Sequence, residues 1–204
     1  MSKSANPEAS TEADLKTIIL HQIISHSETI KRLEQTSIED IKLASIAIAS
    51  TLKDGRTVYW CGNGGSASDS QHMSAELIGK FKKSRKPLRS VALVADMAAI
   101  TCIANDFGYD KIFSRQLEAL GENGDTLVAI STSGNSQNII NALETANAIG
   151  IKTISLLGKG GGVAKDIAKI SITIESRDTT RIQECHQLIG HTICSAIEHM
   201  LGVD

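Results

Sequence analysis

The chain has 204 residues, which is enough for one α/β domain with a well-buried core and short for two. Its formal net charge is −2, so no bulk basic charge favours binding to nucleic acid or to a membrane surface. The polar N-terminus and the lack of an apolar run of membrane-spanning length predict a cytoplasmic protein, neither exported nor membrane-bound.

The N-terminal quarter predicts a tail followed by two helices. Residues 1–11 are expected to be a disordered tail, and residues 12–54 to be helical because apolar residues recur at helical spacing from Leu15 to Leu33. Ser37 followed by Asp40 resembles a capping box that opens the second helix, which should end near Gly55. Two helices ahead of the first strand cannot cover their own apolar faces, which favours packing on another subunit.

Beyond residue 55, short apolar runs alternate with helical segments. The five runs are residues 57–61, 90–94, 126–130, 152–157 and 170–174. Near-continuous β-branched and aliphatic runs of this length are typical of a parallel sheet that is buried on both faces. We therefore expect an α/β fold, a three-layer α/β/α sandwich of the flavodoxin-like or Rossmann-like kind. Its five-stranded parallel sheet and N-terminal helical extension would form a single domain over residues 12–204.

Helix starts and thiols can also be predicted. Asp96, Asp110, and either Asn135 or Ser136 stand where N-caps are needed, and residues 180–201 form a long amphipathic pattern. The cysteines fall in apolar stretches without a C-x-x-C pair, so we expect reduced core thiols. They are Cys61, Cys102, Cys185 and Cys194.

Two loops rich in glycine and hydroxyl side chains follow predicted strands, over residues 61–66 and 131–136. Ligands of parallel sheets bind at the carboxyl ends of strands, where glycines permit close approach and helix N-termini offer free N–H groups. Hydroxyl donors suit phosphate oxygens, although an ordinary turn would also explain either loop alone. Neither loop matches a Walker A or G-x-G-x-x-G pattern, so no nucleotide cofactor is expected.

A second group of polar residues lies on two predicted helices. His72 and Glu76 are four residues apart and share one helical face, as do Gln183, Gln187 and His191 on the last helix. Solvated faces or a surface ion pair would explain each set. Together, two imidazoles, a carboxylate and an amide oxygen could instead form an acid–base pair or bind zinc or a similar ion.

Two further segments carry less specific signals. The basic stretch over residues 80–86 is either a solvated turn or a rim that attracts an anionic ligand. The segment over residues 105–109 lies between predicted helices and could reach the same strand ends. Neither segment identifies a function without its neighbours.

Five motifs occur in order and resemble one family. They are Cys61-Gly62-Asn63-Gly64-Gly65-Ser66, His72-x-x-x-Glu76, Asn105-Asp106-Phe107-Gly108, Ser131-Thr132-Ser133-Gly134-Asn135-Ser136 and Arg181-Ile182-Gln183-Glu184-x-His186. This set closely resembles the phosphoheptose isomerases, a family of SIS-domain sugar isomerases, over about residues 15–200. The serine-rich loop alone marks only the wider SIS superfamily, and the ordered set is more specific.

The resemblance implies an activity and an assembly. It implies the aldose–ketose isomerisation of sedoheptulose 7-phosphate to D-glycero-D-manno-heptose 7-phosphate, the first step of nucleotide-activated heptose synthesis for lipopolysaccharide. It also implies a homotetramer with active sites between subunits and one Zn²⁺ per subunit.

The resemblance further assigns roles to individual residues. Phosphate would be held by Ser131, Thr132, Ser133 and Ser136, and the rest of the substrate by Asn63, Gly64, Gly65, Ser66, Glu76, Asn105, Asp106 and Gln183. Catalysis would rest on Glu76 and His191, and zinc on His72, Glu76, Gln183 and His191. One position departs from the pattern: some relatives carry an acid where this chain has Thr180, and its nearest acid is Asp178.

Two alternatives stay open. A non-catalytic SIS module of the replication-initiator-associating type would share the fold, but that group lacks the acid and histidine that this chain has at Glu76 and His191. An SIS isomerase for a pentose or hexosamine phosphate is the other alternative, and the match over residues 181–191 argues against it.

Overall fold

The computed structural model describes residues 12–202, so the predicted tail over residues 1–11 lies outside the described part. Five parallel strands form one sheet in the order β2-β1-β3-β4-β5, which confirms the predicted sheet and is the flavodoxin-like order. The strands are β1 (Val58–Gly62), β2 (Ser90–Ala92), β3 (Thr126–Ser131), β4 (Lys152–Leu157) and β5 (Ile170–Thr173).

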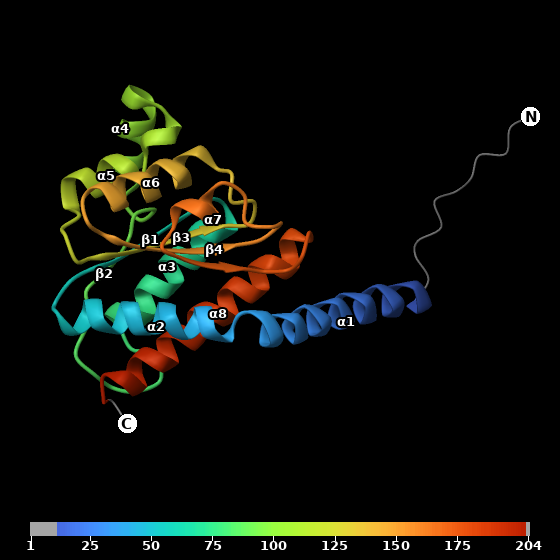
Figure 1. Ribbon diagram of the computed structural model, residues 1–204. Helices are drawn as coiled ribbons and strands as arrows, with labels where there is room; N and C mark the ends of the chain where they lie inside the picture. The colour runs from blue at the N-terminus through green and yellow to red at the C-terminus, as the bar shows by residue number, and fades with distance from the viewer. Residues whose placement is uncertain (1–11, 203–204) are drawn as a thin grey trace, which may run out of the picture.

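Helices cover both faces of the sheet, as the three-layer prediction requires (Figure 1). One face carries α2 (Ile38–Lys53), α3 (Gly65–Ile78) and α8 (Thr179–Met200). The other carries α5 (Ser114–Leu120), α6 (Gln137–Ala148) and α7 (Ala164–Ile167). The remaining helical elements are α1 (Glu12–Thr36), α4 (Met97–Phe107) and the 3₁₀ turn η1 (Tyr109–Lys111). Among the described helices, none combines the length and apolar character that crossing a membrane requires.

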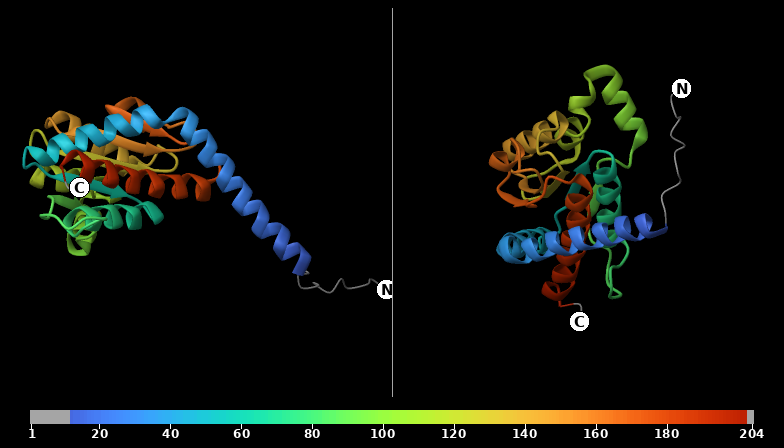
Figure 2. Two further views of the ribbon diagram at one scale, coloured as in Figure 1. Left: turned by 90° about the horizontal axis from the view of Figure 1, so that it is seen from below. Right: turned by 90° about the vertical axis from the view of Figure 1, so that its right-hand side faces the viewer.

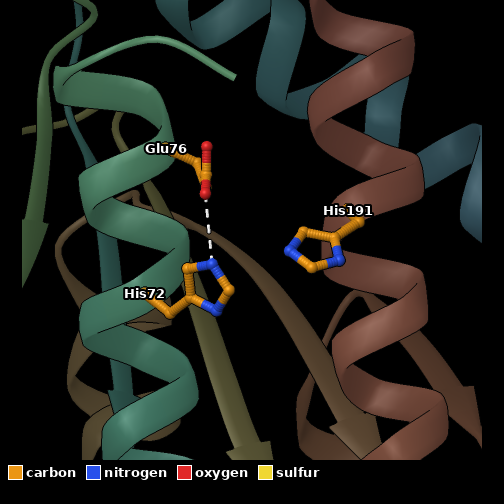
Figure 3. Close-up of side chains that lie close together, drawn as sticks. All are labelled: His72, Glu76 and His191. Carbon is orange, nitrogen blue, oxygen red and sulfur yellow. Dashed lines mark hydrogen bonds and ion pairs between the residues drawn. The ribbon is translucent and has the colours of Figure 1, made fainter. Parts of the chain in front are cut away.

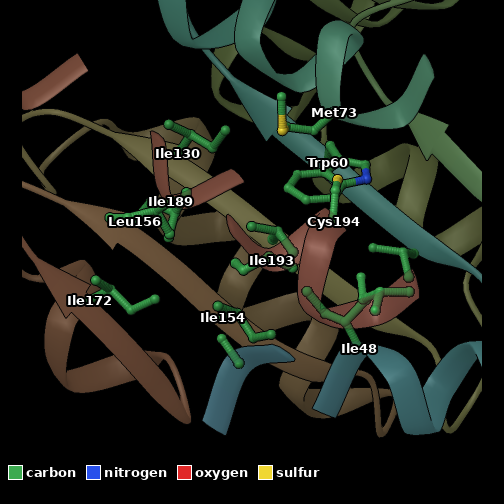
Figure 4. Packing of buried hydrophobic residues seen from close by; sticks show 14 of the residues in the cluster. Ile48, Trp60, Met73, Ile130, Ile154, Leu156, Ile172, Ile189, Ile193 and Cys194 are labelled. Carbon is green, nitrogen blue, oxygen red and sulfur yellow. The ribbon is translucent and has the colours of Figure 1, made fainter. Parts of the chain in front are cut away.

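Alternate residues of each strand supply two separate cores. On β1, Val58 and Trp60 face the α2–α3–α8 layer, while Tyr59 and Cys61 face the α5–α6–α7 layer. Trp60 is fully buried at the centre of the first core (Figure 4), and its indole N–H donates to Ser90 Oγ at 3.0 Å. Truncation of such a side chain to alanine costs about 3–5 kcal/mol. These cores fix α3 and α8 against the same face of the sheet.

The N-terminal extension is less well covered. α1 extends beyond the sheet layers (Figure 2) and leaves Leu15, Ile18 and Ile23 about half exposed. Ser37 occupies the N-cap position of α2, but its side chain makes no capping hydrogen bond, so the predicted capping box is wrong. The physical reason is that the backbone ladder of α1 continues to Ser37, whose N–H donates to Leu33 O at 3.0 Å.

Only some of the residues predicted to cap helices do so in the structure. Asp96 caps α4 by accepting from the N–H of Ala99 at 3.0 Å, as predicted. Asp110 caps no α-helix, because it lies in η1 and α5 begins only at Ser114. Asp178 caps α8 by accepting from Thr180 N–H at 2.8 Å. A local role as N-cap therefore accounts for Asp178.

The cysteines are all free, and three are buried. Burial raises the pKa of the Cys185 thiol to about 11 and that of Cys194 to about 12, and it raises the pKa of Cys61 further. These thiols stay protonated and unreactive near neutral pH. Cys102 is exposed, so its predicted place in the core is wrong, because α4 buries none of its residues.

Candidate active site

The loops that follow β1 and β3 meet at the point where the strand order reverses. Gly62 pairs with Ile130 at the ends of these neighbouring strands. Beyond them, Asn63 and Asn138 exchange two amide hydrogen bonds of 2.9 Å, and the Tyr109 hydroxyl donates to Asn63 Oδ1 at 3.0 Å. The two loops predicted to bind a ligand are thus held together, and Asn138, which sequence reasoning missed, joins them.

A small cavity of about 60 Å³ lies between these loops. It is lined by Asn63, Ser66, Ile130, Ser131, Thr132, Ser133 and Ser136. Ser136 is the N-cap residue of α6 but its side chain makes no capping hydrogen bond, so the first N–H groups of α6 are left for other acceptors. Hydroxyls and a helix N-terminus around a space of phosphate size are suited to an anion. The cavity brings together all four residues predicted to hold phosphate.

Two glycines keep the site narrow. Gly134 has a φ of +66°, and a Cβ there would lie 1.8 Å from Gly161 O. Gly65 opens α3, and a Cβ there would lie 2.1 Å from Gln183 Nε2. Any side chain at either position would displace the neighbouring loop or Gln183, which explains why glycine is required.

A second cluster lies further along α3, where His72, Glu76 and His191 face one another (Figure 3). His72 Nε2 is 3.1 Å from Glu76 Oε1, one helical turn away on the same face. His191 projects from α8, and its ring meets that of His72 edge to face with centroids 5.0 Å apart. All three side chains are half-buried, so they are both accessible and partly desolvated.

The donor set fits a metal ion. One ligand atom from each residue lies within 4.8 Å of the others. Two ligands of a tetrahedral zinc ion lie roughly 3.3 Å apart, and His72 Nε2 and Glu76 Oε1 already have this spacing. Gln187 Nε2 lies 3.2 Å from His72 Nδ1, so an amide contacts the ring nitrogen that faces away from the cluster. A ligating histidine ordinarily donates its other ring N–H to an acceptor, so Gln187 would serve His72 in this way with its amide turned to present the oxygen.

Gln183, predicted as a fourth ligand, lies nearer the start of α3. Its amide packs on Gly65 and forms a hydrogen bond with Asp69. Asp69 is buried and one of its oxygens has no partner among the described residues. Burial raises the pKa of Asp69, and the Gln183 hydrogen bond and nearby His72 oppose that rise. Sequence reasoning missed Asp69, although its position three residues before His72 places it on the same face of α3.

α3 connects the cavity to the cluster. Ser66 lines the cavity in the first turn of α3, and His72 and Glu76 follow on the same helix. At 1.5 Å per residue, they lie roughly 9 and 15 Å further along the axis. That separation is comparable to the length of an extended sugar phosphate, so one ligand could reach both places.

Within one chain, Asn105 and Asp106 line neither the phosphate-sized cavity nor the His72–Glu76–His191 cluster. Both are exposed near the end of α4, where Asn105 Nδ2 donates to Asp106 Oδ1 at 2.7 Å. Tyr109, a few residues further along the chain, does reach the site, where it contacts Asn63. Their predicted role at the sugar stays a prediction.

Comparison with known proteins finds relatives that match most of the chain. Residues 23–158 match the SIS domain family. A phosphoheptose isomerase from Aliarcobacter butzleri is 47% identical over 188 residues, which cover 92% of this chain and 100% of that protein. The structure of a phosphoheptose isomerase from Francisella tularensis superposes with a TM-score of 0.88 at 34% identity, covering 93% of this chain and 100% of the other. That of the phosphoheptose isomerase from Neisseria gonorrhoeae superposes with a TM-score of 0.86 at 36% identity, covering 91% and 99%.

Proposed function

The chain belongs to the phosphoheptose isomerases of the SIS-domain family, and we propose on this basis that it converts sedoheptulose 7-phosphate to D-glycero-D-manno-heptose 7-phosphate. The observation that carries the proposal is that α3 links a phosphate-sized cavity to a carboxylate–imidazole cluster. A sugar phosphate bound by its phosphate would place its other end near Glu76 and His191. This reaction supplies the heptose for nucleotide-activated heptose synthesis, as in lipopolysaccharide formation.

Phosphate binding orients the sugar. Ser131, Thr132, Ser133 and Ser136 surround the cavity, and each hydrogen bond to a charged oxygen contributes about 1.5–3 kcal/mol. The phosphate takes no part in the bonds that change, so its binding energy serves to hold the reacting end in place. Asn63 lines the same cavity, and Gly64 and Gly65 follow it at the start of α3, so these three residues would contact the sugar near its phosphate.

Isomerisation moves a proton between C1 and C2 through an enediolate. Glu76 is the base that removes and returns the carbon-bound proton, and His191 opens the ring and moves protons between the hydroxyl oxygens. A positioned acid or base contributes about 10²–10⁴-fold, or 3–5 kcal/mol, which is too little for an unactivated C–H bond. The enediolate oxygens therefore need further electrostatic stabilisation.

One zinc ion per subunit is part of the proposal. His72, Glu76 and His191 would hold it, with Gln183 as the fourth ligand after a change of side-chain position. When bound, zinc would act as a Lewis acid that stabilises negative charge on the sugar oxygens. The half-buried donor set supports this part of the proposal, and Gln187 would accept from His72 Nδ1 with its amide turned to present the oxygen.

We further propose a cytoplasmic homotetramer with active sites at subunit interfaces. The exposed apolar side chains of α1, among them Ile18, Ile19 and Ile23, support burial against another copy of the chain. Asn105 and Asp106 are exposed near the end of α4, and this exposure supports a role for them in a site that more than one subunit completes.

The direct test is to incubate the purified protein with sedoheptulose 7-phosphate and to follow the aldose product, with and without a chelator. We expect turnover that the chelator suppresses. Turnover only of a pentose or hexosamine phosphate would assign another SIS isomerase. Binding of the sugar phosphate without turnover would instead indicate a non-catalytic SIS module.

A further inference from the structure

The basic loop between α3 and β2 is held by one buried carboxylate. Glu198, on the last turns of α8, accepts the backbone N–H groups of Phe81, Lys82 and Lys83 at 3.2–3.3 Å. Its side chain is 6% exposed. Three amide donors to one carboxylate fix the backbone of the loop, which passes beside the end of α8 in Figure 1. The loop is therefore not merely a solvated turn, although its lysine side chains are exposed.

Arg85 extends this anchor to α3. Its Nε donates to Glu198 Oε1 at 3.2 Å, and its side chain is 4% exposed. The same guanidinium donates to Leu77 O at 2.8 Å and to Glu76 O at 2.7 Å, which satisfies carbonyls at the C-terminus of α3. Glu198 and Arg85 thereby connect α8 to the turn of α3 that carries Glu76.

The anchored loop places an aromatic ring on His191. The rings of Phe81 and His191 stack with centroids 5.5 Å apart and an interplanar angle of 23°. His72 contacts the same imidazole edge to face. None of the described residues makes a hydrogen bond to the His191 ring, whereas His72 has contacts to Glu76 and Gln187. Ring packing by Phe81 and His72 is thus what orients His191 within the described chain.

We propose that Phe81 is a positioning residue for His191 and that Glu198 acts on the same imidazole through the loop it anchors. The inference rests on the proposed role of His191 in catalysis and metal binding. A flat ring stacked on the imidazole limits rotation about its side-chain bonds, so the nitrogen that faces His72 and Glu76 stays in place. Leucine at residue 81 would fill part of the space without offering a flat surface.

The test compares Phe81→Leu, Phe81→Tyr and the wild type, with Phe113→Leu as the control. Phe113 is buried in the opposite core, so the control makes the same chemical change far from His191. We expect Phe81→Leu to lower kcat and to weaken zinc binding, each by about ten- to a hundredfold, with KM changed much less. Phe81→Tyr, which keeps the ring, should restore both, and Phe113→Leu should lower the melting temperature without changing either.

Glu198→Gln is the second variant, because it keeps the shape of the side chain but weakens its bonds to the loop. We expect it to reproduce the kcat and zinc-affinity losses of Phe81→Leu in part, and the double variant to add little to Phe81→Leu alone. Zinc affinity is measured by competition with a chelator on the folded proteins, so it is independent of turnover.

Normal kcat and normal zinc affinity in a folded Phe81→Leu protein would overturn the inference. So would equal losses in Phe81→Tyr and Phe81→Leu, because the ring would then not matter. If the proposed function is wrong, the result is different, because the wild type itself would not isomerise the sugar. In that case the zinc-affinity comparison still decides whether Phe81 orients His191.

Discussion

The imidazole rings of His72 and His191 lie edge to face with centroids 5.0 Å apart, although they belong to helices at opposite ends of the sheet-forming part of the chain. The two helices, α3 and α8, pack on the same face of the sheet through a shared core. This packing brings the imidazole of α8 next to the carboxylate of Glu76. The predictions below test what each part of this arrangement does.

Glu76→Gln should remove turnover while leaving substrate binding intact. Glutamine keeps the size of the side chain but cannot accept the carbon-bound proton, so kcat should fall by about 10²–10⁴-fold or more. Substrate binding, followed by calorimetry, should persist because the phosphate cavity is unchanged. Glu39→Gln, on the exposed side of α2, is the matched control. Near-normal turnover of Glu76→Gln would rule out this residue as the base.

Ser133→Ala should act mainly on KM. The hydroxyl lines the phosphate cavity, and loss of one charge-assisted hydrogen bond should raise KM about ten- to a hundredfold. Inhibition by inorganic phosphate should weaken in parallel. Ser27→Ala, whose hydroxyl bonds only to its own helix, is the control. If KM stays at the wild-type value, Ser133 does not hold the phosphate.

Protein purified without a chelator should contain about one zinc ion per chain, and its removal should abolish turnover until zinc is returned. The two glutamines of α8, Gln183 and Gln187, should contribute differently to zinc affinity. Gln183→Ala should weaken zinc binding more than Gln187→Ala, for which about a tenfold loss is expected because Gln187 contacts only the far nitrogen of His72. The opposite order would assign the fourth ligand to Gln187, and full activity without metal would exclude a role for zinc.

Acid should destabilise the fold through His186. Burial lowers the pKa of His186 to about 4, and its Nε2 lies 3.0 Å from Leu157 O. The unfolded chain, with a histidine pKa of about 6.5, binds a proton there that the folded chain excludes. The free energy of unfolding should therefore fall by about 3 kcal/mol as the pH drops from 7 to 4, at 1.36 kcal/mol per unit.

Denaturant unfolding between pH 4 and pH 7 measures this effect. In His186→Gln the same drop in pH should cost less by about 3 kcal/mol, because glutamine does not titrate. The other histidines contribute equally to both proteins, so the difference isolates His186. Parallel pH profiles for the two proteins would contradict the prediction.

The strands and the phosphate loop were predictable because their signals are local. A buried parallel strand needs a short apolar run, and the run over residues 152–157 coincides with β4. The hydroxyl residues of Ser131–Ser136 form the cavity because a strand end, a tight turn and a helix start follow one another directly. The caps at Asp96 and Asp178 also depend only on neighbouring backbone.

Other features depended on contacts that the local sequence does not encode. Asp110 looks like a helix cap, but it lies in the 3₁₀ turn η1, and α5 begins only at Ser114. Cys102 lies in an apolar stretch yet is exposed, since α4 packs none of its residues into the core. The basic loop was open to two interpretations, a solvated turn or a rim for an anionic ligand, because no residue near it in the sequence indicates that Glu198 binds its backbone.

The sequence by itself determined the α/β class, the serine loop and the candidate residues His72, Glu76 and His191, because residue type and spacing are sufficient for these. Only the tertiary structure decided that the three side chains converge, that Gln183 lies against Gly65 and Asp69, and that Phe81 stacks on His191. The physical reason is that these distances are set by how α3, α8 and the loop after α3 pack over one face of the sheet.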